Sequence, residues 1–238
     1  MTALEIAVTH RRRLREIWRS AGWPCQDTIE IELLAAGLLE RVRDLAGRET
    51  LRVTDMGIAV LAQTLKRNRA KRDAHEMLVE RVAREMQRAG RVVWRGLSLR
   101  AKVGEAWCMA MPDVYSIRHT TVEAYLEPVV HEIKVSRADL LSDLRRSAKG
   151  SAYLELCGEC WYVIRAGIAG AEEIPEPFGV IAAHDAHFEV LRPALKRAHE
   201  MRFHVWMSLA RAAPLPGGDD DPQRWLGDPG EDAQNIDD

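Results

Sequence analysis

The feature that most constrains the fold is a charged pair inside an apolar run, "VVHEIKVS", at residues 129–136. Such a run is typical of a buried strand, in which residues two apart share one face of the sheet. Glu132 and Lys134 therefore point to one side. The residues before, between and after them point to the other side: His131, Ile133 and Val135. Because burying unpaired charges is costly, we expect the pair to face a cleft while the opposite side anchors the strand in the core.

Short apolar runs on both sides of this segment predict further strands, separated by helical patterns. Strands are expected over residues 91–99, 106–117, 125–136, 160–167, 178–184 and 187–193. Helices are expected over residues 73–89, 137–157 and 193–213. Ser136 is the expected N-cap of the middle helix, with Asp139 in its first turn. This order predicts an α/β fold in which a mixed sheet is flanked by helices.

The N-terminal part of the chain has a different pattern. Helices are expected over residues 3–20 and 27–40, strands over 39–43 and 51–54, and a new helix that Thr54 or Asp55 caps. The run from Ala35 to Leu61, "AAGLLERV…TLRVTDMGIAVL", resembles the second half of bacterial winged-helix domains, and the resemblance covers roughly residues 25–66. It implies a domain that binds DNA or, in some members, only other proteins.

The charges are distributed unevenly along the 238 residues, although the net charge is only −2. Residues 1–103 carry 21 Lys and Arg against 13 Asp and Glu, whereas residues 217–238 carry one Arg against 8 Asp and Glu. A basic N-terminal half is typical of proteins that bind nucleic acid. We expect a winged-helix-like domain over 1–70, a second domain over 71–213 and an acidic disordered tail over 214–238.

The composition favours a cytoplasmic, nucleoid-associated protein. The apolar runs are too short to cross a bilayer, and the N-terminus lacks the pattern of a signal peptide. The four cysteines include a CxxC pair, Cys157 and Cys160, but no second pair has the spacing of a zinc site. We expect reduced thiols, with a redox pair or half of a metal site as the alternatives. Trp94, Trp107 and Trp161 are expected in the core.

A second acidic residue is expected beside Glu132. If the strand that contains Asp113 pairs with the strand of Glu132, the two carboxylates come close together and resist joint ionisation. A divalent cation removes that conflict, and Mg²⁺ prefers carboxylate, water and phosphate oxygens. Lys134 is placed to hold an attacking water and to offset developing negative charge. These residue types suit metal-assisted hydrolysis of a phosphodiester.

The pattern "PDV", 17 residues and then "EIK" resembles the signature of the PD-(D/E)xK, or restriction-endonuclease-like, nuclease superfamily. The surrounding sequence, over about residues 75–212, is similar to the MmcB-type family of bacterial DNA-repair endonucleases. The resemblance implies a restriction-endonuclease-like sheet that follows a small winged-helix domain. It also implies that Asp113, Glu132 and the Ile133 carbonyl hold the metal, and that Lys134 is the catalytic lysine.

A further metal ligand is expected from the helix before the first strand. Glu80 lies ten residues before Gly90, and this spacing resembles that of archaeal junction resolvases, which implies that Glu80 is a catalytic residue and a metal ligand. Glu76, one turn earlier on the same face, is the alternative.

Several residues around the site have expected roles of lower specificity. Four cations on or near the helix after the charged strand are expected to hold DNA phosphates, with a solvated helix face as the alternative: Arg137, Arg145, Arg146 and Lys149. His131 is expected to be structural. Tyr153 matches a tyrosine that recurs in the MmcB-type pattern, or else packs under the sheet.

These observations predict a DNA endonuclease that depends on Mg²⁺ or Mn²⁺ and acts in DNA repair or in mobile-element or phage defence. The expected partner is DNA, with no membrane. The resemblance also allows a homodimer, because nucleases of this fold often pair to cut both strands. The alternative is a DNA-binding or adaptor protein whose nuclease-like domain does not cut.

Overall fold

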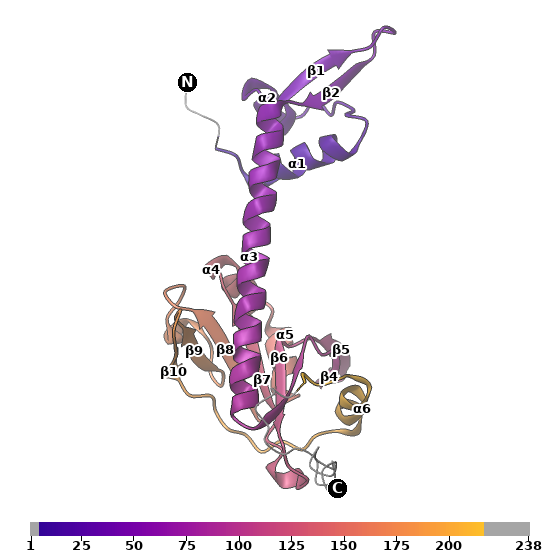
Figure 1. Cartoon of the computed structure of the whole chain (residues 1–238). Coiled ribbons are helices and arrows are strands. Elements are labelled where there is room, and N and C mark those ends of the chain that lie inside the picture. Colours follow the sequence, from indigo (N-terminus) through magenta and orange to yellow (C-terminus); the bar gives the residue numbers. More distant parts are fainter. Residues whose placement is uncertain (1–4, 217–238) are drawn as a thin grey trace, which may run out of the picture. The chain divides into compact units, whose positions relative to one another are not determined.

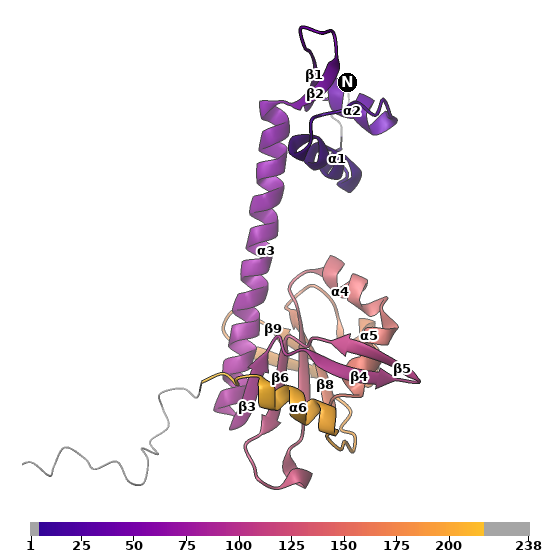
Figure 2. The same ribbon diagram turned by 90° about the vertical axis from the view of Figure 1, so that its right-hand side faces the viewer.

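The computed structural model describes residues 5–216, which form two compact units divided between Asp73 and Ala74. The expected acidic tail lies almost entirely outside the described residues. Figures 1 and 2 label the helices and strands of each unit. Within residues 5–216, no helix has both the length and the apolar composition needed to cross a membrane.

The first unit contains two helices, a hairpin and the first part of a long helix. In chain order these are α1 (Val8–Arg19), α2 (Thr28–Ala35), β1 (Leu39–Arg43), β2 (Glu49–Val53) and α3 (Asp55–Arg88). The strands β1 and β2 pair antiparallel, with Leu39 opposite Val53. Leu14 and Leu33 are completely buried against this hairpin. The predicted hairpin and the helix after it are therefore confirmed, although α1 begins later and α2 ends earlier than expected.

The helix α3 corrects the expectation of two separate helices, because one helix runs from Asp55 to Arg88 (Figure 1). Between residues 58 and 88 the sequence contains neither Gly nor Pro, and the Lys, Arg and Ala that fill it are good helix formers. Its N-terminus is capped as expected, since Oγ1 of Thr54 accepts a hydrogen bond of 3.2 Å from the Gly57 N–H.

The second unit is built on a six-stranded mixed sheet, so the prediction of an α/β fold with helices around a mixed sheet is confirmed. The strands lie in the order β10-β9-β8-β7-β6-β3. Their bounds are β3 Arg91–Arg95, β6 Val114–Arg118, β7 Val129–Lys134, β8 Glu159–Arg165, β9 Gly179–Ala183 and β10 Phe188–Arg192. The strands β7, β8 and β9 are parallel, and the other neighbours are antiparallel.

Helices cover both faces of this sheet. The C-terminal half of α3 packs Val79, Val82 and Ala83 against one face, where Val114 and Ile133 point. The opposite face is covered by α4 (Arg137–Leu144), α5 (Ser147–Leu154), α6 (Phe203–Arg211) and the hairpin of β4 (Leu99–Val103) and β5 (Ala106–Ala110). Two short 3-10 helices, Glu123–Tyr125 and Ala171–Glu173, lie in connections. Figure 2 shows α3 and α5 on opposite sides of the strands.

Several expected elements are shorter than predicted. Gly96, with a φ of +57°, follows β3, and the predicted strands 91–99 and 106–117 each divide so that β4 and β5 form a hairpin of their own. The predicted helix 137–157 divides at Arg145 and Arg146 into α4 and α5. The predicted helix 193–213 begins only at Phe203. The guanidinium of Arg197 ties the preceding segment to the carbonyls of Leu154 and Cys157, at 3.0 and 2.9 Å.

Some individual side chains differ from expectation and others agree with it. Ser136 is the N-cap residue of α4, but its side chain makes no capping bond. Trp94 is buried as expected and Trp161 is partly buried, whereas Trp107 is 49% exposed on the β4–β5 hairpin. Cys157 and Cys160 are buried free thiols.

Two glycines in the first unit allow a test of its packing. Both Gly22 and Gly37 have positive φ, +74° and +69°, but a Cβ at Gly22 would lie 2.1 Å from the Leu51 carbonyl oxygen, while one at Gly37 meets nothing within 4 Å. We expect Gly37→Ala to lower the free energy of unfolding by about 1 kcal/mol. Gly22→Ala adds a backbone collision and should cost roughly 3 kcal/mol or more. Urea unfolding of both variants measures the difference, and equal losses would show that the collision is relieved.

His131 lies on the α3 side of β7, 2% exposed, and its Nδ1 has no hydrogen-bond partner among the described residues. Burial and then the charge of Arg91 lower the pKa of His131 to about 3. The unfolded chain therefore binds more protons than the native one between that pH and about 6.5, so acid destabilises the protein across this window. We expect His131→Leu to reduce the loss of unfolding free energy between pH 6 and pH 4. His119→Leu, at an exposed position, should leave that loss unchanged.

Candidate active site

The candidate site lies where β7 ends and β6 begins. Val114 pairs with His131, and this register would place Pro112 opposite Ile133 if the pairing continued. Proline has no N–H to donate, so the antiparallel pairing stops there. The side chain of Asp113 replaces the missing backbone partner, because its Oδ2 accepts a hydrogen bond of 2.7 Å from the Ile133 N–H. The expected approach of Asp113 to the strand of Glu132 is therefore present.

Glu132 is held by three donors on the other face of the sheet from His131. Its Oε1 lies 2.6 Å from Nζ of Lys134 and 2.5 Å from Nζ of Lys149. Its Oε2 accepts a hydrogen bond of 2.8 Å from the Tyr153 hydroxyl. Glu132 and Lys134 are only 2% and 4% exposed, so the expectation that they face an open cleft is wrong. Charge-assisted hydrogen bonds from all sides offset the cost of this burial.

A second carboxylate, Asp143 of α4, joins the same network. Its Oδ1 lies 2.7 Å from Nζ of Lys149 and 3.7 Å from Nζ of Lys134, and its Oδ2 accepts from the Tyr162 hydroxyl at 3.0 Å. We call this group the Glu132 cluster: Glu132, Lys134, Asp143, Lys149, Tyr153 and Tyr162. Asp143 was missed in the sequence, although its position three residues after the buried Leu140 places it on the inward side of α4.

The hydroxyl of Tyr153 is the most enclosed donor of the cluster. It lies 2.8 Å from Oε2 of Glu132 and 3.0 Å from the Met111 carbonyl oxygen, and its single hydrogen serves one of them at a time. Burial, followed by the charge of Glu132, raises the pKa of Tyr153, and the charges of Asp113 and Asp143 raise it further. All three carboxylates therefore act on one hydroxyl, which stays protonated and remains a donor.

The cationic partners of the carboxylates have shifted pKa values as well. Burial lowers the pKa of Lys149, but Glu132 and Asp143 outweigh it, so that the pKa is raised overall. His75 on α3 was not predicted; its Nε2 lies 3.4 Å from Oδ2 of Asp113. The interaction with Asp113 raises the pKa of His75, against the opposing effect of burial. Its position four residues before Val79, which packs on the sheet, is the signal that could have identified it.

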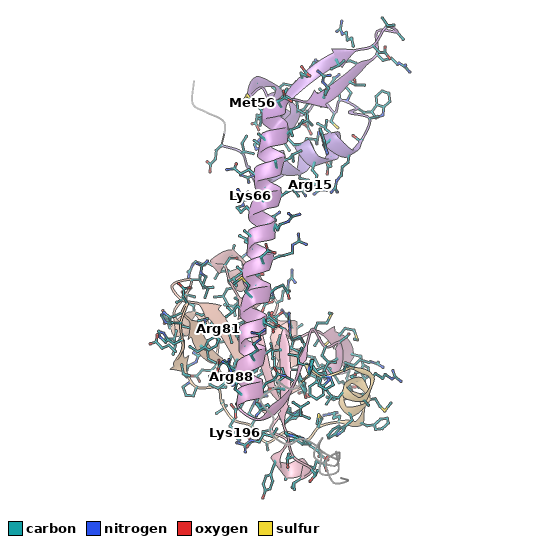
Figure 3. All side chains as sticks on the ribbon, viewed as in Figure 1. Arg15, Met56, Lys66, Arg81, Arg88 and Lys196 are labelled. Atoms are coloured by element: carbon teal, nitrogen blue, oxygen red, sulfur yellow. The ribbon has the colours of Figure 1, made fainter. Side chains whose placement is uncertain are left out.

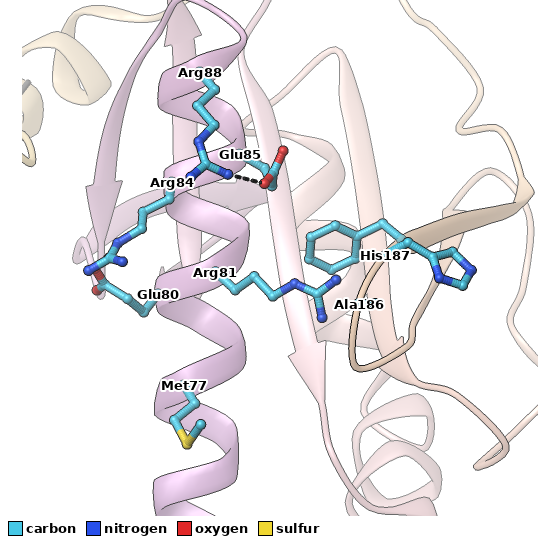
Figure 4. Close-up of a pocket in the computed structure, with 9 residues that line it drawn as sticks. Met77, Glu80, Arg81, Arg84, Glu85, Arg88, Ala186 and His187 are labelled. Atoms are coloured by element: carbon cyan, nitrogen blue, oxygen red, sulfur yellow. Dashed lines mark hydrogen bonds and ion pairs between the residues drawn. The ribbon is translucent and has the colours of Figure 1, made fainter. Parts of the chain in front are cut away.

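Glu80 and Glu76 lie outside the Glu132 cluster. Glu80 pairs with Arg84 at 2.9 Å and with Arg95. Glu76 pairs with Arg95 at 3.0 Å, and its Oε1 lies 3.7 Å from Nδ1 of His75. Glu80 is five residues from His75, which turns it about 140° away around the helix. It lines a surface groove of about 790 Å³ between α3 and the β9–β10 connection, where Figure 4 shows it beside Arg84. Neither glutamate bonds to Asp113 or to the Glu132 cluster.

The four cations expected to hold phosphates have different environments. Arg137 makes a double ion pair with Glu173, at 2.9 and 2.7 Å, and also donates to the Ile168 carbonyl. Lys149 belongs to the Glu132 cluster. Arg145 and Arg146 are exposed, and neither pairs with a carboxylate among the residues that the structure describes.

The oxygen atoms between the end of β7 and the start of β6 are of the kind that a hard cation prefers. Asp113, Glu132 and the Ile133 carbonyl supply them, and two ammonium groups already lie at Oε1 of Glu132. Within residues 5–216, however, no three side chains of His, Cys, Asp or Glu are grouped as they would be around a metal ion. An ion at this position would therefore take at most two side-chain carboxylates and would complete its shell with water and substrate oxygens.

The chain was compared with family models, curated proteins and solved structures. No family model matches the chain, and no curated protein matches it significantly. Among solved structures, the chain is similar to a protein of unknown function from Silicibacter pomeroyi. The match has 25% sequence identity and covers 50% of this chain and 69% of that chain, with a TM-score of 0.36. At that score the similarity supports no statement about fold or function.

The Glu132 cluster makes a prediction about stability. Tyr153→Phe leaves one oxygen of a buried carboxylate without its donor, which should lower the free energy of unfolding by about 1.5–3 kcal/mol. Tyr125→Phe is the matched control, because Tyr125 is 63% exposed and its hydroxyl makes no hydrogen bond within the described residues. Urea unfolding measures both. A loss for Tyr153→Phe no larger than that of the control would show that Glu132 does not need this donor.

Proposed function

We propose that the chain is a metal-dependent DNA endonuclease of the PD-(D/E)xK type that hydrolyses phosphodiester bonds. The observation that carries the proposal is the position of Asp113, whose carboxylate is fixed to the backbone of Ile133 between Glu132 and Lys134. A mixed sheet flanked by helices holds these residues where the interior strand β7 ends and its neighbour β6 begins. The resemblance of the sequence to this superfamily rests on Asp113, Glu132 and Lys134, together with Pro112 and Ile133.

The ion at this site would be Mg²⁺ or Mn²⁺, held by Asp113, Glu132 and the Ile133 carbonyl. When bound, it supplies an acidified water and stabilises the negative charge that develops on the phosphate. Lys134 lies beside Glu132, and its proposed role is to hold a water by donating to it. Tyr153 keeps the glutamate in a fixed orientation through Oε2. Glu80 remains only a predicted ligand. Its carboxylate is paired with Arg84 and Arg95 and makes no contact with Asp113 or the Glu132 cluster.

The substrate we propose is DNA, and the setting is DNA repair or defence against mobile elements or phage. The first unit contributes a hairpin followed by a helix, which is compatible with the winged-helix resemblance and with a role in binding DNA. Arg145 and Arg146 keep their proposed contact with phosphates. We also retain a homodimer and a nucleoid-associated location in the cytoplasm as parts of this proposal.

A second candidate is a DNA-binding or adaptor protein that does not cut. The observation that favours it is the ammonium group of Lys149, which lies 2.5 Å from Oε1 of Glu132 and 2.7 Å from Oδ1 of Asp143. In this arrangement the carboxylate of Glu132 is fully occupied by three donors from the chain itself. Metal binding then requires Lys149 to give up its contact with Glu132.

Cleavage assays separate the two candidates. The purified chain should cut linear, single-stranded or branched DNA in Mg²⁺ or Mn²⁺. Glu132→Gln and Asp113→Asn should each reduce the rate by about 100-fold or more without weakening DNA binding. Glu105→Gln is the matched control, because Glu105 is exposed on the β4–β5 turn. The cleavage rate of Glu80→Gln decides whether Glu80 belongs to the site.

Binding without cleavage of any of these DNAs, under both metals, would favour the second candidate. Loss of DNA binding together with cleavage in Glu132→Gln would instead point to a structural role for this residue.

A further inference from the structure

A basic stretch in α3 is exposed on every side of the helix. We call residues 66–72 the basic segment, and its five cations are Lys66, Arg67, Arg69, Lys71 and Arg72. All residues from Leu65 to Asp73 are exposed, so no part of this stretch packs against a core. Figure 3 shows the side chain of Lys66 projecting from the helix. A helix that is polar all round needs many ion pairs of its own or a partner.

The basic segment has no such ion pairs. None of its cations lies within ion-pair distance of a carboxylate in residues 5–216, whereas many other exposed cations of the chain are paired. Examples are Arg12, Arg48, Arg88, Arg118 and Lys196. The segment itself contains no acidic residue, and its cations are neighbours of one another at spacings of three and four residues. Like charges at these spacings destabilise a helix.

The cations form two rows. At about 100° per residue, Lys66, Arg69 and Arg72 lie on one side of the helix, and Arg67 and Lys71 lie on the opposite side. A single extended acidic chain would face only one of these rows. Two rows of phosphates, one on each side of a helix, are what the two backbones of a DNA major groove present.

We propose that the basic segment of α3 binds the phosphate backbones of duplex DNA. The inference rests on the proposed function for its choice of partner, and it assigns the main phosphate contacts to α3. Of the four cations near α4 that were expected to hold phosphates, Arg137 and Lys149 are already paired with carboxylates. Because the contacts are to phosphates, this binding is independent of base sequence.

The test replaces the five cations of the segment together: Lys66→Gln, Arg67→Gln, Arg69→Gln, Lys71→Gln and Arg72→Gln. Glutamine has a helix propensity close to that of Lys and Arg, so α3 is retained, and circular dichroism checks this. The matched control replaces three arginines and two lysines that are exposed or half-exposed and ion-paired: Arg12→Gln, Arg88→Gln, Lys102→Gln, Arg118→Gln and Lys196→Gln. Both variants change the net charge by the same amount.

Duplex DNA binding is measured against salt concentration in EDTA without divalent metal, so that cleavage does not interfere. Each phosphate contact contributes about 0.9 to the slope of log affinity against log salt. We expect the segment variant to lose roughly 3 units of slope or more, and the control to lose less than about 1. Equal losses in the two variants would show an effect of net charge alone and would overturn the inference.

Two further outcomes separate this inference from the proposed nuclease activity. If the segment variant binds with an unchanged slope while the chain with Glu132 intact cuts DNA, the inference fails and the nuclease proposal stands. If the slope falls as expected but the intact chain cuts no DNA, the nuclease proposal fails and the binding surface stands. Polyglutamate that binds as tightly as the duplex, and loses its binding in the same variant, would make an acidic protein the partner and overturn the inference.

Discussion

The buried carboxylate of Glu132 is the interaction on which the second unit depends. Its donors come from β7 and α5, and through Lys149 and Asp143 the network extends to α4 and β8. A charge that is 2% exposed is tolerated only where its partners are placed accurately, because each missing donor leaves an unpaid desolvation cost. The network of this side chain therefore links the neighbouring strands β7 and β8 to α4 and α5 on one face of the sheet.

The sequence predicted the part of the site that is local in the chain. Alternation in a strand places Glu132 and Lys134 on one side, and "PDV" at the start of a neighbouring strand brings Asp113 to them. Lys149, Asp143 and His75 could not be placed in this way, because their contacts depend on the rotation of three helices about their own axes. The spacing of Asp143 to Leu140 and of His75 to Val79 indicates that these residues face inward, but it does not indicate which charged group they meet there.

The errors in the predicted elements have a similar origin. One helix was expected as two because "LKRNRAKR" has no apolar face, yet it contains nothing that breaks a helix. Residues 193–202 were expected to be helical, but contacts of Arg197 with carbonyls far away in the chain hold them in another conformation. In both cases the local pattern was weak and the outcome was decided by helix propensity or by tertiary contacts.

The contact between Asp113 and the Ile133 N–H gives one residue two tasks. Pro112 ends the pairing of β6 with β7, and the carboxylate that replaces the next backbone partner is the same group proposed to hold the metal. The length of this strand pair and the position of the acid cannot vary independently. A change that extended the pairing by two residues would satisfy the backbone of Ile133 and release Asp113 from its anchor, so the sheet must stay short here for the acid to stay in place.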